Sequence, residues 1–132
     1  MLYLDTNIFV YATLNTEDYG DKAECLLQRI SRGEEQAITS VLTFDETFWA
    51  VKKDRGIEKA LEAAQALLNF PNLEIVPATR ETASLALQLI KECGLRPRDA
   101  MHAATAIAEK ADCIISTDAD FYRVKRLKRK SL

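Results

Sequence analysis

Apolar residues recur along the chain at two spacings, which separate strands from helices. Short, mostly apolar runs predict four strands, at 2–4, 37–39, 73–76 and 113–115. Between these runs, apolar residues recur at intervals of three and four positions, the repeat that keeps side chains on one face of a helix. This repeat predicts helices near 23–30, 40–54, 60–68, 79–93 and 97–108.

Glycine and proline stand where the predicted helices begin or end. Gly33 and Gly94 follow the last apolar position of a helix, the place where glycine commonly ends helices. Gly56 breaks one helix and Pro71 stops the next, whereas Pro97 suits the first turn of a helix. The chain has only four glycines and three prolines, with no linker or repeat. At 132 residues, it is expected to form a single domain.

Strands that alternate with helices of ten or more residues are typical of a parallel sheet with helices on both faces. In such sheets, ligands bind beyond the carboxyl ends of the strands. Two of the predicted strands are followed by acid at that end, the first by Asp5 and the fourth by Asp118. Because parallel strands end along one edge, these two carboxylates can be close in space despite their distance in sequence.

The composition is that of an ordinary globular protein, with 48% hydrophobic and 29% charged residues. No apolar stretch approaches the ~20 residues of a membrane-spanning helix, so no membrane association is expected. The first residues meet a charge at Asp5 without a basic region, which is unlike a secretory signal. The three cysteines form no paired spacing, which favours a reduced, cytoplasmic setting.

Charge is distributed unevenly along the chain. Six of the 18 Lys and Arg residues lie in the last ten positions, 123–132, which contain no acid. A basic tail on an acidic body is suited to contact a polyanion such as RNA. A solvated, partly frayed end is the alternative. The residues expected to contact nucleic acid are Lys128, Arg129 and Lys130.

Four acids occur where the surrounding sequence is apolar: Asp5, Glu46, Asp99 and Asp118. Three of them also have a structural interpretation, because Asp99 can cap a helix, Glu46 can face solvent, and Asp118 can form a turn with Asp120. Asp5 is the least easily explained in this way, since it directly follows a buried strand. Asp45 cannot share the direction of its neighbour Glu46, since successive helical residues differ by ~100°. Converging carboxylates would repel one another unless a cation such as Mg²⁺ were bound.

The segments that carry these acids resemble the PIN domain, and within it the VapC-type toxin nucleases of prokaryotic toxin–antitoxin pairs. They are residues 4–8 (LDTNI), 39–46, 98–106 (RDAMHAATA) and 115–121 (ISTDADF). They occur in the family's order over essentially the whole chain. The resemblance implies one PIN-like domain over 1–132, an α/β/α sandwich around a parallel sheet of four or five strands. The short basic C-terminus departs from the family, which often has a final strand there.

The resemblance also implies a catalytic site that binds Mg²⁺ or Mn²⁺ through the four acids Asp5, Glu46, Asp99 and Asp118. Three further residues match supporting positions of the family: Asn7, Thr117 and Asp120. We therefore expect an endoribonuclease that cleaves RNA with a metal-activated water. By resemblance it is the toxin of a toxin–antitoxin pair, a homodimer, and is blocked by a cognate antitoxin.

Other functions remain open at this stage. A housekeeping RNA-processing nuclease would carry the same acids, and a PIN-like scaffold would bind RNA or protein without cutting. A phosphatase of the Asp-x-Asp-x-Thr/Val type is disfavoured, because residues 118–122 end in tyrosine. The only histidine, His102, is expected to be a helix-packing residue and not a catalytic base. The aromatic residues Phe44, Phe48 and Trp49 are expected in the core or a dimer interface.

Overall fold

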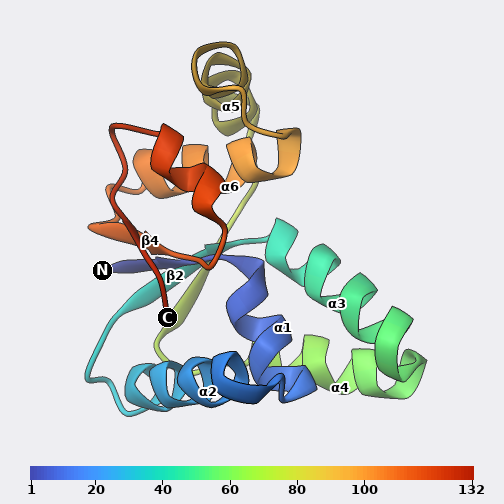
Figure 1. Ribbon diagram of the computed structural model, residues 1–132. Helices are drawn as coiled ribbons and strands as arrows, with labels where there is room; N and C mark the ends of the chain where they lie inside the picture. Colours follow the sequence, from blue (N-terminus) through green and yellow to red (C-terminus); the bar gives the residue numbers. More distant parts are fainter.

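In a computed structural model of residues 1–132, five parallel strands form one sheet in the order β3-β2-β1-β4-β5 (Figure 1). The strands are β1 (Leu2–Leu4), β2 (Ala37–Ser40), β3 (Leu73–Val76), β4 (Cys113–Ile115) and β5 (Arg129–Lys130). The four predicted strands are confirmed. The chain proceeds from β1 through β2 to β3 on one side and then crosses to β4 and β5 on the other. The order therefore reverses between β1 and β4, the position at which open parallel sheets bind ligands.

Six helices connect the strands. They are α1 (Thr6–Leu14), α2 (Glu17–Ser31), α3 (Leu42–Arg55), α4 (Ile57–Leu68), α5 (Arg80–Cys93) and α6 (Pro97–Ala108). Helices α2 to α6 confirm the five predictions, and α5 is capped at its start by Thr79 and ends at Gly94 in the left-handed conformation. Helix α1 was not predicted, because its apolar residues do not keep to one face. None of these helices is both long and apolar enough to cross a membrane.

The sheet is covered on both faces, as expected for an α/β/α sandwich. Figure 1 shows α5 and α6 on one side of the sheet and α1, α2 and α4 on the other. Successive side chains of β1 point to opposite faces of the sheet and pack in two different hydrophobic clusters. Tyr3 belongs to the cluster that includes Ala103 of α6, and Leu4 belongs to the cluster that includes Ile8 of α1. Each large aliphatic side chain buried in this way contributes about 1.5–3 kcal/mol.

The basic C-terminal segment is packed against the domain, which contradicts the alternative of a frayed end. A 3₁₀ helix, η1 (Ala119–Arg123), follows β4, and the side chains of Phe121, Val124 and Leu127 are buried in the core. The Arg129 guanidinium lies 4.5 Å from the centre of the Tyr122 ring, an attractive cation–π contact. Apolar residues at three-residue intervals hold this segment in place, and β5 completes the sheet.

Candidate active site

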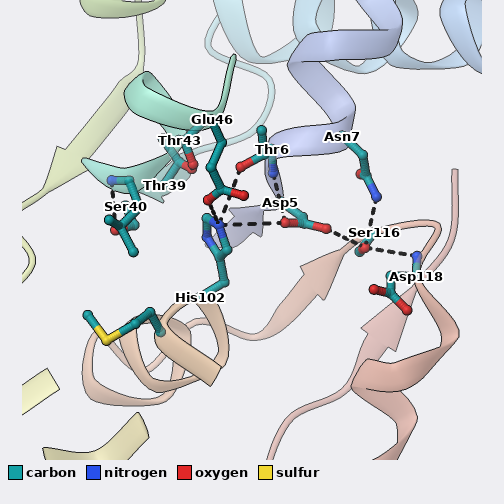
Figure 2. A network of polar contacts seen from close by, with 12 residues as sticks. Asp5, Thr6, Asn7, Thr39, Ser40, Thr43, Glu46, His102, Ser116 and Asp118 are labelled. Carbon is teal, nitrogen blue, oxygen red and sulfur yellow. Dashed lines mark hydrogen bonds and ion pairs between the residues drawn. The ribbon is translucent and has the colours of Figure 1, made fainter. Parts of the chain in front are cut away.

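The ends of β1 and β4 bring two of the predicted acids together. Leu4 pairs with Ile115 in the sheet, so Asp5 and Ser116 leave the same edge side by side. The Ser116 hydroxyl donates to Asp5 Oδ2 at 2.6 Å and accepts from the Asp118 backbone N–H at 3.0 Å (Figure 2). Ser116 thereby links the two acids. Ser116 was not among the predicted site residues. Its position at the end of a predicted strand, two residues before Asp118, could have indicated it.

Asp5 is buried, and both of its carboxylate oxygens are engaged. It is 7% exposed, and Oδ1 accepts from the Thr6 backbone N–H at 2.8 Å, which caps the start of α1. Burial raises the pKa of Asp5, although His102 and the hydrogen bonds from Ser116 and Thr6 act in the opposite direction. Asp5 is therefore an anchored carboxylate at the base of the site.

Three partly buried acids lie close enough to share one cation. Asp99, Asp118 and Asp120 each offer a carboxylate oxygen, and these oxygens lie within 4.8 Å of one another. Asp99 is the third residue of α6 and does not cap that helix. Burial, and then the charges of Asp118 and Asp5, raise the pKa of Asp99 to about 6. Hard carboxylate oxygens are the donors that Mg²⁺ and Mn²⁺ prefer, so these residues fit such an ion.

Glu46 faces the same region from α3. It lines an open pocket of about 450 Å³ together with Asp99 and Asp118. Its neighbour Asp45 is exposed and does not line this pocket, in agreement with the predicted difference in direction. Glu46 and Asp5 lie outside the three-acid group. Glu46 is hydrogen-bonded to His102 instead, and Asp5 to Ser116.

His102, on α6, lies between Glu46 and Asp5. It is buried, as predicted, but it also makes polar contacts that the sequence did not reveal (Figure 2). Nε2 lies 2.6 Å from Glu46 Oε1 and 3.9 Å from Asp5 Oδ1, while Nδ1 lies 2.6 Å from the Tyr3 hydroxyl. That hydroxyl accepts from the Ser40 backbone N–H. Tyr3 can therefore donate to Nδ1, which leaves Nε2–H to donate to Glu46.

The charge around His102 opposes the effect of its burial. Burial lowers the pKa of His102, whereas the hydrogen bond to Glu46 and the charges of Asp5 and Glu46 raise it. The raising effects together are larger, so the pKa lies above its ordinary value. Burial has the opposite effect on Tyr3: it raises the pKa of the hydroxyl, which stays protonated. Tyr3 was missed because a buried tyrosine in a strand looks like an ordinary core residue.

The supporting residues have different surroundings. Asn7 Nδ2 donates to Ser116 Oγ at 3.2 Å and to Thr117 Oγ1 at 3.0 Å, so both predicted residues brace the loop after β4. The Asp120 backbone N–H donates to Asp118 Oδ1 at 2.8 Å, which is the turn expected as an alternative role for these acids. The basic residues expected to contact RNA do not line the pocket. They form β5 and the position directly before it, which we call the β5 segment: Lys128, Arg129 and Lys130.

Comparisons with known proteins agree with this fold. Residues 2–127 match the PIN domain. The chain is similar to a structure of VapBC2 from Rickettsia felis bound to a promoter DNA fragment, at 25% identity and a TM-score of 0.72, over 99% of this chain and 98% of that one. It shares its fold with VapC20 from Mycobacterium tuberculosis, a sarcin-ricin-loop-cleaving toxin, at 15% identity and a TM-score of 0.79, over 95% of each chain. FitAcB from Neisseria gonorrhoeae has the same fold, at 18% identity and a TM-score of 0.73, over 98% of this chain and 96% of that one. A comparison with curated protein sequences gives no match.

Proposed function

The chain belongs to the PIN domain family, and we propose that it is a divalent-metal-dependent endoribonuclease that acts as the toxin of a toxin–antitoxin pair. The observation that carries this proposal is the placement of four acids around the strand ends at the β1–β4 reversal. Asp99, Asp118 and Glu46 line one pocket, and Asp5 is tied to the Asp118 backbone through Ser116. A site of this composition repels RNA phosphates unless a cation offsets its charge.

The acids have distinct roles in the proposed reaction. Asp99, Asp118 and Asp120 would hold Mg²⁺ or Mn²⁺, which lowers the pKa of a bound water and offsets phosphate charge. Glu46 keeps one oxygen, Oε2, without a hydrogen-bond partner, so it can orient the attacking water. Asp5 is a positioning residue: through its hydrogen bond with Ser116 it fixes the loop that carries Asp118.

His102 positions Glu46 in this scheme. Its imidazole holds Glu46 Oε1 at 2.6 Å, and Tyr3 holds the imidazole from the other side. A glutamate side chain has three rotatable bonds, so a single short hydrogen bond to a buried ring restricts its direction strongly. This contact therefore holds the Glu46 carboxylate in place at the wall of the pocket.

The partners we propose are RNA, an antitoxin and a second copy of the chain. Several similar structures are toxin–antitoxin complexes, including VapBC assemblies, which supports an antitoxin partner. Exposed apolar residues on α3 and α4, namely Phe44, Trp49, Leu61 and Leu68, suit burial in a homodimer. Lys128 and Lys130 of the β5 segment are exposed and remain candidates for RNA contact.

RNA cleavage by the purified chain tests the function. We expect cutting of single-stranded RNA in Mg²⁺ or Mn²⁺, no cutting in chelator, and restoration when metal is added back. Asp99→Asn should abolish cleavage, whereas the control Asp45→Asn should cut like wild type, because Asp45 is exposed outside the pocket. RNA binding without cleavage under all these conditions would instead identify a scaffold. Unchanged cutting by Asp99→Asn would refute the site.

A further inference from the structure

Two arginine side chains stand at the mouth of the acidic pocket. Arg96 and Arg98 line the same pocket as Glu46, Asp99 and Asp118, and no apolar residue other than Pro97 contributes to its wall. Both arginines are exposed. The pocket thus combines three carboxylates with two guanidinium groups that come from the start of one helix, α6.

Neither guanidinium is neutralised by the acids beside it. Four other arginines of the chain pair with a carboxylate, as Arg55 does with Asp54 at 2.9 Å and Arg123 with Asp120 at 3.4 Å. Arg96 and Arg98 make no ion pair within 4.0 Å and no side-chain hydrogen bond, although acids line the same pocket. Their donors are therefore available to a ligand.

We propose that Arg96 and Arg98 bind the phosphate backbone of RNA next to the scissile bond, an inference that rests on the proposed nuclease function. Guanidinium groups match phosphate oxygens with two parallel hydrogen bonds, which a point charge cannot do. An acidic pocket needs positively charged groups beside the metal site. The phosphates on either side of the reacting phosphate also lie near carboxylates, and no metal ion offsets their charge. The β5 segment does not supply them at this pocket.

The kinetic effect of removing both arginines tests this assignment. Arg96→Gln combined with Arg98→Gln should raise KM for RNA roughly tenfold or more, with kcat within about threefold of wild type. Two lost phosphate contacts should reduce the slope of log(kcat/KM) against log salt by ~1.4. Arg96→Lys combined with Arg98→Lys should restore the slope but recover KM only in part, because lysine keeps the charge and loses the planar guanidinium group.

A charge-matched control uses Arg32→Gln combined with Arg80→Gln, two exposed arginines that do not line the pocket. This control should leave KM and the salt slope near wild type. The proposal is overturned if the pocket double variant keeps the wild-type KM and slope, or if the control pair changes them equally. Binding of labelled RNA in Mn²⁺, followed by anisotropy, gives the same comparison without turnover. If wild type binds RNA through the arginines but does not cut it, the nuclease function fails and the binding site stands.

Discussion

Replacing Asp99 by Asn should stabilise the protein when no metal is bound. Burial and the charges of Asp118 and Asp5 raise the pKa of Asp99 to about 6, against 3.8 for the free side chain. A carboxyl group whose pKa is higher in the folded state contributes stability below its unfolded pKa. It loses that stability as the pH rises through about 6. At pH 7.5 the ionised side chain therefore destabilises the metal-free fold.

The magnitude follows from the size of the shift. Two pKa units correspond to ~3 kcal/mol for a fully buried group. Because Asp99 is only half-buried, solvent screening reduces this to about 1–2 kcal/mol. Asparagine keeps the shape and removes the charge, so Asp99→Asn should be more stable than wild type by that amount at pH 7.5. For a domain of this size, this is a rise in the thermal midpoint of about 4–8 °C.

Thermal melts followed by circular dichroism measure this difference in chelator. At pH 5 the gap should narrow, because wild-type Asp99 is then mostly protonated. Mg²⁺ should raise the wild-type midpoint more than that of the variant, since a ligand stabilises the state that binds it. The exposed control Asp45→Asn should stay within about 0.5 kcal/mol of wild type. The reasoning is refuted if Asp99→Asn is no more stable than wild type at pH 7.5, or if the gap is the same at pH 5.

Four further outcomes are expected. Glu46→Gln should reduce kcat by roughly 10²-fold or more, while the adjacent exposed Asp45→Asn leaves kcat unchanged in the same RNA cleavage assay. His102→Leu should lose about 1–3 kcal/mol in urea unfolding and also lower kcat, because it leaves Glu46 without its partner. The RNA products should carry 5′-phosphate and 3′-hydroxyl ends, since water is the proposed nucleophile; cyclic 2′,3′-phosphates detected by mass spectrometry would contradict this. Gly20→Ala should lower the free energy of unfolding, measured in urea, by at least ~1 kcal/mol, because a Cβ there would lie 2.9 Å from the backbone of Asn15.

Much of the fold follows from local pattern. The apolar runs were sufficient to locate four strands, and a one-sided apolar pattern located α2, α4, α5 and α6. Helix α3 has no such pattern and was located by the residues at its two ends, Ser40 and Gly56. Helix α1 escaped this reasoning: Ile8 and Phe9 are buried, but the apolar residues around them do not form one stripe. Strand β5 also escaped, since a two-residue strand of Arg129 and Lys130 has no apolar signature of its own.

All four acids of the site were singled out from the sequence, but only two of them through their place in the fold. Glu46 and Asp99 lie on helices and were identified by their apolar surroundings and by the resemblance to the PIN domain. Asp5 and Asp118 are recognisable because each follows a buried strand. The partners of these acids are not, because a buried histidine or tyrosine has the same local pattern whether it packs or orients a carboxylate. His102 was expected only to pack, and its contact with Glu46 joins α6 to α3, which is a property of the tertiary structure.

The neighbouring positions of β1 and β4 also determine when activity can arise during protein synthesis. The hydrogen bond between Ser116 and Asp5 spans 111 positions of sequence, and chains are synthesised from the N-terminus at ~5–20 residues per second. A nascent chain that carries β1 but has not yet reached β4 lacks Ser116 and Asp118, so its site cannot assemble. A ribosome that makes this protein is therefore not exposed to an active nuclease in the growing chain until β4 has been translated and has left the exit tunnel.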